Sequence, residues 1–201
     1  MNPEQVKKYL SLNHEENIES ARKNLIPAII RTPLIRSDFF SSEYGCDVYL
    51  KPENQQRTGS FKIRGAYNKI ANLTEEEKKC GVICSSAGNH AQGVAYSAKE
   101  KNIPAVIVMP NVTPLLKVEG TKALGAKVIL HGDVYDEAYR YATELSEKEG
   151  YTFVHPFDDY DVLCGQGTSG LEILDELPDT DEILVPIGGG GLYGSSFAAP
   201  R

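Results

Sequence analysis

Val82-Ile83-Cys84-Ser85-Ser86-Ala87-Gly88-Asn89-His90 runs from a short apolar segment through small residues toward a helix, and this stretch decides the fold class. Val82–Ser85 predicts a buried strand, residues 89–101 predict a helix, and the Val- and Ile-rich segment Ala105–Met109 predicts a second strand. Strands joined by a helix in this way lie parallel, through a right-handed crossover. The stretch therefore predicts a parallel α/β sheet.

The same alternation extends in both directions along the chain. Toward the C-terminus we expect helices over residues 114–124, 135–150 and 162–177, and strands over Lys127–Leu130 and residues 151–154 and 182–187. Toward the N-terminus we expect helices over residues 15–30, 37–44 and 64–73, and a strand over residues 46–51. Pro33 is expected to close the first of these helices, and Ser37 and Gly45 to bound the second. Residues 78–154 are expected to form a four-stranded layer of their own.

The composition excludes several classes of protein. The chain has 201 residues and a formal net charge of -7, whereas proteins that bind nucleic-acid backbones concentrate Lys and Arg on one face. Its four cysteines form no CxxC pair and have no histidine at zinc-finger spacing, so neither a disulfide scaffold nor a metal site is expected. No segment approaches about 18 consecutive apolar residues, and the N-terminal residues carry no apolar export signal. We therefore expect a cytoplasmic protein without a nucleic-acid, membrane or metal partner.

Upstream of the strand and helix unit, Thr58-Gly59-Ser60-Phe61-Lys62-Ile63-Arg64-Gly65-Ala66 places a lysine between a small-residue turn and a helix start. The ordinary alternative for such a lysine is a solvated surface charge. Here Phe61, Ile63 and Ala66 are expected to bury the stem of Lys62 among apolar groups. Burial disfavours the ammonium form, lowers the pKa and leaves a nucleophilic amine. Lys62 is therefore the candidate catalytic residue, of the kind that forms a Schiff base.

The turn that follows Val82–Ser85 is a second candidate site. A turn between a strand and a helix exposes backbone N–H groups that bind carboxylate or phosphate, and Ser86 and Asn89 can add side-chain donors. The alternative is an ordinary turn in which Ser86 or Asn89 caps the helix. His90 can equally be a hydrogen-bonded core histidine.

A third candidate site is Gly188-Gly189-Gly190-Gly191, which follows the last predicted strand. Consecutive glycines let the backbone approach a bound group closely, as a phosphate requires. A flexible turn is one alternative, and a dinucleotide-binding loop of an NAD-dependent oxidoreductase is another, although the GxGxxG spacing is poorly matched. A desolvated lysine, a carboxylate-binding turn and a glycine cradle together predict pyridoxal phosphate held near an amino acid.

At these motifs the chain resembles the fold-type II pyridoxal-phosphate enzymes, and most closely the threonine/serine dehydratases (threonine ammonia-lyases). The resemblance runs from about residue 20 to Leu192. It rests on five motifs that occur in the family's order: Lys51-Pro52-Glu53, the stretch around Lys62, Ser85 to Gly93, Gly165-Gln166-Gly167-Thr168, and Gly188 to Leu192. It implies an α/β fold of two open, twisted, mostly parallel sheets with flanking helices. The larger, cofactor-binding domain would comprise residues 1–77 and 155–201, and the smaller, inserted α/β domain residues 78–154.

The resemblance also implies a role for each candidate residue. Lys62 would be the Schiff-base lysine, Phe61 would lie against the cofactor ring, and Asn89 would hydrogen-bond the 3′-oxygen of the ring. The backbone of Gly188, Gly189, Gly190, Gly191 and Leu192 would hold the phosphate. Ser86, Ala87, Gly88, Asn89 and His90 would grip the substrate carboxylate.

The implied activity is the dehydration and deamination of L-threonine, and of L-serine, to a 2-oxo acid and ammonia. Isoleucine biosynthesis is the implied pathway, with a catabolic role left open, and a homodimer or homotetramer is the implied assembly. Serine racemases resemble the chain too, but they carry a serine immediately before Gly-Asn-His where this chain has Ala87, which cannot transfer a proton.

The resemblance ends shortly after the glycine loop. Catalytic domains of the family continue well beyond this loop, so we expect the larger domain to be incomplete at its C-terminal side. The alternative to an active enzyme is therefore a non-catalytic fragment of one, with the fold but without the complete pocket.

Overall fold

Val82–Ser85 (β3) and Ala105–Met109 (β4) form the centre of a parallel sheet in the computed structural model, which describes residues 14–193. Lys127–Leu130 (β5) pairs with the outer side of β4, and Thr152–Phe153 (β6) pairs with the other side of β3. The strand order is therefore β5-β4-β3-β6, with every pair parallel. This four-stranded sheet confirms the predicted α/β class.

Both faces of the sheet are covered by helices because successive strand residues point to opposite sides. One face packs against Asn89–Glu100 (α6) and Leu115–Ala123 (α7), and its strand residues are Val82, Cys84, Ile107 and Met109. The opposite face packs against Tyr135–Glu149 (α8) through Ile83, Val106 and Val108. β3 and β4 are buried along their whole length, which explains why their sequences are continuously apolar.

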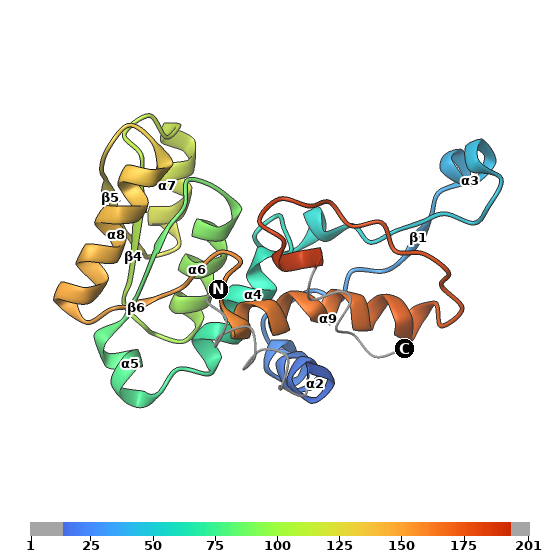
Figure 1. Ribbon diagram of the computed structural model, residues 1–201, viewed down its shortest axis with the longest axis horizontal. Coiled ribbons are helices and arrows are strands. Elements are labelled where there is room, and N and C mark those ends of the chain that lie inside the picture. The colour runs from blue at the N-terminus through green and yellow to red at the C-terminus, as the bar shows by residue number, and fades with distance from the viewer. Residues whose placement is uncertain (1–13, 194–201) are drawn as a thin grey trace, which may run out of the picture.

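A group of packed helices lies beside the sheet (Figure 1). It comprises His14–Leu25 (α2), Lys62–Ala71 (α4) and Tyr160–Glu176 (α9). α4 and α9 approach closely where two glycines face each other: a Cβ on Gly165 would lie 2.5 Å from the carbonyl oxygen of Arg64. Glu75–Cys80 (α5) begins after the cap residue Thr74, which forms a capping box with Glu77, and leads into β3.

The remaining elements form an arm that projects away from the sheet (Figure 1). Ile35–Arg36 (β1) pairs antiparallel with Tyr49–Leu50 (β2), and Asp38–Tyr44 (α3) lies between them. As predicted, Ser37 caps α3 and Gly45 ends it in the left-handed conformation, at φ 68°. A short 3-10 helix, Glu53–Gln55 (η1), leads from the arm toward α4.

Three sequence predictions are wrong in detail. α2 ends at Leu25 and not near residue 30, because Pro27 disfavours helical geometry at the residue before it and offers no N–H group. The strand predicted over residues 46–51 is confined to Tyr49–Leu50. Residues 182–187 are not a strand: Leu184 is 92% exposed, and no strand lies beside this segment within residues 14–193.

Outside the parallel sheet, the described residues contain one further strand pair, β1 and β2, which is antiparallel. The N-terminal residues considered above for an export signal lie outside the described range. Between residues 14 and 193, no helix is both long and apolar enough to cross a membrane.

Candidate functional site

The strand order predicts a ligand site between β3 and β6. From β3 the chain adds β4 and β5 on one side, and then returns to place β6 on the other side. In open α/β sheets, ligands bind outside the carboxyl ends of the strands at the point where the order reverses. The segments that leave these two strands are the turn from Ser86 to His90 and the segment from His155 to Phe157.

Lys62 reaches this point from α4. It is the first residue of the helix, and its Nζ donates a hydrogen bond to the carbonyl oxygen of Pro156 at 2.8 Å. The same nitrogen lies 5.3 Å from the centroid of the Phe61 ring. Burial lowers the pKa of Lys62, in the direction that the sequence predicted. A half-buried amine of lowered pKa can act as a nucleophile or a base.

The turn after β3 is not an ordinary side-chain cap. Gly88 is the cap residue of α6 and has no side-chain cap bond. Ser86 Oγ accepts a hydrogen bond from the backbone N–H of Gly88 at 3.2 Å, which shapes the turn itself, and Ala87 lies between these two residues. Asn89 is the exposed first residue of α6, and its side chain makes no hydrogen bond to another residue of the described chain. The Asn89 amide is therefore accessible to a ligand.

His90 ties this turn to the neighbouring strand. Its Nε2 lies 2.9 Å from the carbonyl oxygen of Val154, so Nε2 carries the proton and donates it. Burial lowers the pKa of His90 to about 4, and the hydrogen bond to Val154 opposes this only in part. The ring is therefore neutral, and its buried Nδ1 has no hydrogen-bond partner within residues 14–193. A hydrogen-bonded core histidine, the alternative considered from the sequence, would explain the contact of Nε2 but not the buried Nδ1 without a partner.

The glycine loop lies against the same segment. A Cβ on Gly189 would lie 2.4 Å from the Phe157 ring, and one on Gly191 would lie 3.1 Å from Phe157 Cβ. Gly190 has φ +83°, which a side chain disfavours, and a Cβ on Gly188 would have open space around it. Gly191 and the partly buried Leu192 begin a helical turn. Gly189 and Gly191 therefore allow the loop to approach Phe157 closely. Phe157 is two residues after His155 in the sequence.

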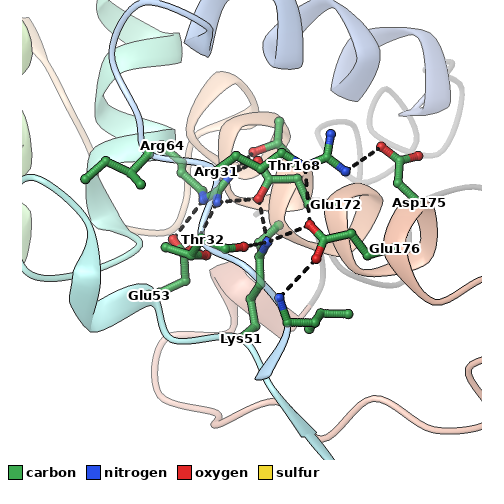
Figure 2. A network of polar contacts seen from close by, with 12 residues as sticks. Arg31, Thr32, Lys51, Glu53, Arg64, Thr168, Glu172, Asp175 and Glu176 are labelled. Carbon is green, nitrogen blue, oxygen red and sulfur yellow. Dashed lines mark hydrogen bonds and ion pairs between the residues drawn. The ribbon is translucent and has the colours of Figure 1, made fainter. Parts of the chain in front are cut away.

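Arg64 anchors the helix that begins at Lys62 (Figure 2). Its guanidinium is fully buried and makes two hydrogen bonds to each of two carboxylates, Glu53 and Glu172, all at 2.8 Å. A further hydrogen bond at 3.0 Å reaches Thr168 Oγ1. Burial by itself would lower the pKa of Arg64 and raise that of Glu53, but their mutual hydrogen bonds and charges shift both pKa values the other way. Arg64 and Glu53 therefore stay ionised at neutral pH.

Lys51 completes the charge balance of this network (Figure 2). Its Nζ lies 2.7 Å from Glu172 Oε2 and donates to the carbonyl oxygen of Thr32 at 2.5 Å. Thr32 Oγ1 in turn donates to Glu53 at 2.7 Å. The side chains of two cationic residues and two carboxylates thus join η1, α4 and α9. The network includes Arg64, which is two residues after Lys62 in the sequence.

The sequence analysis named two of the motifs in this network but did not predict that they form a buried ion-pair network. Lys51-Pro52-Glu53 and Gly165 to Thr168 were noted only as parts of a resemblance, and Glu172 was missed. Pro156 and its neighbours His155 and Phe157 were missed too. Their position directly after a predicted strand was the signal that could have found them.

The fold is that of an α/β protein, and its candidate ligand site lies at the topological switch point of the sheet. The chain matches the family model described as "Pyridoxal-phosphate dependent enzyme" over residues 25–198. It therefore belongs to the family of pyridoxal-phosphate dependent enzymes.

Within this family, the chain is similar to curated proteins named as threonine ammonia-lyases or threonine dehydratases. The chain is 56% identical over 177 residues to an L-threonine ammonia-lyase of Thermotoga maritima, covering 88% of this chain and 44% of that protein. It is 52% identical to a catabolic L-threonine dehydratase of Staphylococcus aureus, covering 88% of this chain and 51% of the other. The chain thus spans about half the length of the curated relatives it matches.

Solved structures agree on the fold. Threonine deaminase isoform 2 of Solanum lycopersicum superposes with a TM-score of 0.89 at 41% identity, over 98% of this chain and 53% of that one. Maize serine racemase superposes with a TM-score of 0.88 at 37% identity, over 92% of this chain and 56% of that one.

The residues at the switch point fit pyridoxal phosphate, the cofactor of this family. An amine of lowered pKa faces the segment on which the glycine loop rests. Buried polar atoms without a hydrogen-bond partner in the described part of the chain include Ser85 Oγ at the end of β3, His90 Nδ1 in the turn that follows, and Thr58 Oγ1 in the segment that leads to Lys62. A polar ligand would satisfy such atoms, whose burial without a partner costs about 1–3 kcal/mol each.

Proposed function

We propose that this chain, alone or as part of a longer polypeptide, carries out the pyridoxal-phosphate dependent dehydration and deamination of L-threonine, and of L-serine, to a 2-oxo acid and ammonia. The observation that carries this proposal is the half-buried Lys62 amine, of lowered pKa, at the switch point of a sheet in this enzyme family. The names of the most similar relatives support threonine as the substrate.

Lys62 has two tasks in this proposal. Pyridoxal phosphate, when bound, would supply an aldehyde that bonds amines and a ring that accepts the electrons of the substrate Cα–H bond. Lys62 Nζ would hold the cofactor between turnovers and would take the Cα proton of the substrate during a turnover. The lowered pKa serves both tasks, since a protonated amine can do neither.

The other candidate residues bind and orient. We propose that Phe61 packs against the cofactor ring, that the Asn89 amide donates to its 3′-oxygen, and that the backbone from Gly188 to Leu192 holds its phosphate. We propose that the turn comprising Ser86, Ala87, Gly88, Asn89 and His90 binds the substrate carboxylate. The accessible Asn89 side chain and the positive φ of Gly190 support these assignments.

Two alternatives rest on specific observations. Serine racemisation needs a second proton donor, and the likeness to maize serine racemase favours it, but Ala87 offers no proton. The second alternative is a non-catalytic fragment of such an enzyme, and the chain spans about half the length of the curated relatives it matches.

Several coarser features complete the proposal. We propose a larger domain of residues 1–77 and 155–201 around a smaller one of residues 78–154, and the confinement of the parallel sheet to Val82 through Phe153 supports it. We also propose a cytoplasmic location, which the free state of all four cysteines supports, and a homodimer or homotetramer. Isoleucine biosynthesis is the proposed pathway, since 2-oxobutanoate is the product from threonine.

The test begins with cofactor binding. The chain is incubated with pyridoxal phosphate, reduced with borohydride and digested, and the labelled lysine is identified by mass spectrometry. Label is expected on Lys62, with a visible absorbance band before reduction. Lys62→Ala should lose both, whereas Lys148→Ala, a change at a side chain that is 78% exposed, should keep both.

Turnover then separates the alternatives. Release of 2-oxobutanoate and ammonia from L-threonine supports the proposal, and D-serine formed from L-serine supports the racemase. A chain labelled at Lys62 that releases no oxo acid is the non-catalytic fragment. Absence of label on Lys62 contradicts the proposal.

A further inference from the structure

A cavity of about 640 Å³ lies beside the lysine site. It is lined by Tyr135, Asp136, Tyr139 and Arg140, from the first two turns of α8, and by His155 and Phe157, from the segment after β6. Asp136 and Arg140 lie four residues apart on exposed positions, so the charges at the rim balance. The cavity is open to the surface along much of its boundary, so this volume includes space that solvent can enter.

The cavity adjoins Lys62 through one tripeptide. His155 and Phe157 line the cavity, and the carbonyl oxygen of Pro156 between them accepts the hydrogen bond from Lys62 Nζ. The Phe157 ring also touches the glycine loop at Gly189. The cavity and Lys62 thus share this tripeptide, and the charge of Lys62 also contributes to lowering the pKa of His155.

Aromatic rings form the wall of the cavity. Tyr139 lies 6.0 Å from both Tyr135 and His155, measured between ring centroids, and His155 meets Phe157 edge-on at 4.7 Å. Such a wall favours an apolar group.

His155 adds one directed hydrogen-bond donor to this wall. Its Nδ1 accepts from the backbone N–H of Asp158 at 2.7 Å and from that of Phe157 at 3.3 Å. Because both contacts are donors, Nδ1 must be unprotonated and Nε2 carries the hydrogen. Burial also lowers the pKa of His155, against the raising effects of Asp158 and Asp159. The Nε2–H group makes no hydrogen bond to another described residue.

We propose that this cavity receives the substituents on Cβ of the amino-acid substrate, with the Nε2–H group of His155 donating a hydrogen bond to the β-hydroxyl oxygen. This inference rests on the proposed function. It makes His155 a specificity-determining residue: as a neutral imidazole, it recognises the hydroxyl without supplying a proton. The volume leaves room for a substituent larger than the methyl group of threonine.

The test compares two ligands that differ at the hydroxyl. L-Threonine and L-2-aminobutyrate are mixed rapidly with the cofactor-loaded chain, and dissociation constants are read from the amplitude of the first change of the cofactor absorbance, before the turnover of threonine that the proposed function implies. The unaltered chain should prefer threonine by about 3- to 10-fold, as one neutral hydrogen bond allows. His155→Phe keeps a ring against Tyr139 and Phe157 but removes the donor, so the preference should fall to about 1. His155→Gln restores an N–H donor and should recover part of it.

The outcomes separate this inference from the function beneath it. A chain that takes no cofactor contradicts the proposed function and this inference together. A loaded chain in which His155→Phe weakens both ligands alike, or leaves the preference unchanged, contradicts the inference alone. If His155→Phe does not fold, ¹⁵N spectra of the unaltered ring decide: the His155 Nε2–H signal should move with threonine and not with 2-aminobutyrate.

A bulkier ligand tests the room in the cavity. L-threo-3-Phenylserine carries the same hydroxyl with a ring in place of the methyl group. It should bind to the loaded chain within about tenfold of threonine, because the aromatic wall accepts its ring. Exclusion of phenylserine would show that the cavity does not receive the Cβ substituents.

Discussion

At the scale of single residues, the placement of Lys62 depends on charges that it does not touch. Arg64, two residues on, is fully buried between Glu53 and Glu172. A buried ion pair contributes little net stability compared with apolar groups, but removing one member leaves an unpaired charge, which costs about 3–5 kcal/mol. The network therefore specifies one position for the first turn of α4.

Arg64→Met tests this at the residue scale. It leaves two buried carboxylates without their main partner, so the free energy of unfolding in urea should fall by about 3–5 kcal/mol. Arg36→Met is the matched control: its partner Asp47 is exposed, and the loss should be about 0–1 kcal/mol. Equal losses in the two variants would contradict a stabilising role for the buried network.

The ion pair between Glu53 and Arg64 should also make the free energy of unfolding depend on pH, in a direction that the Glu53 pKa determines. The Glu53 pKa is lowered in the folded protein, so the contribution of its ion pair is present above the unfolded pKa and is lost as pH falls through the folded pKa. In Arg64→Met, protonation instead relieves the unpaired Glu53 carboxylate. The stability difference between the two proteins should therefore narrow toward acid pH.

At the scale of elements, the first turn of α4 is held between two helices by glycines. A Cβ on Gly93 of α6 would lie 3.2 Å from the Lys62 carbonyl group, and one on Gly165 of α9 would lie 2.5 Å from the Arg64 carbonyl oxygen. Both neighbours are backbone atoms, which cannot rotate away as a side chain can. The two helices thus fix the direction in which α4 presents Lys62.

Gly165→Ala should separate α4 from α9. The added methyl group meets backbone, so the expected loss is about 1–3 kcal/mol in the free energy of unfolding, together with weaker labelling of Lys62 by pyridoxal phosphate. Gly120→Ala is the control within a helix, because its Cβ would meet only Gln92 Nε2 at 3.6 Å. That variant should be neutral or up to about 1 kcal/mol more stable. If the Gly165→Ala protein were as stable as the Gly120→Ala protein, α4 and α9 would not approach each other closely at Gly165.

At the scale of the whole molecule, sequence patterns predicted those strands and helix ends that depend on neighbouring residues. The apolar runs of β3 and β4 and the cap Ser37 are short-range signals, and these elements were predicted correctly. The early end of α2 at Pro27 was readable by the same rules and was missed. The pairing of Arg64 with Glu172, 108 residues away, depends on the tertiary fold and left no local signal.

The candidate site divides in the same way. Lys62, Asn89 and the four glycines stand in motifs with a chemical meaning, so the sequence was sufficient to propose them. His155 and Phe157 stand in no such motif. Their importance follows from the position of β6 beside β3, which no sequence pattern gives directly.

The segment that was wrongly predicted as a strand carries the last prediction. Residues 182–187 have the apolar pattern of a strand, yet Leu184 is 92% and Ile187 is 66% exposed. An unpaired apolar segment offers hydrogen-bonding groups and side chains to another chain. Changing both residues to Asp should therefore reduce self-association in analytical ultracentrifugation, while the free energy of unfolding of the monomer should change by less than about 0.5 kcal/mol. Leu116→Asp, on α7 at 82% exposure, is the control and should leave association unchanged. Association that persists in the double variant would place the contact elsewhere on the molecule.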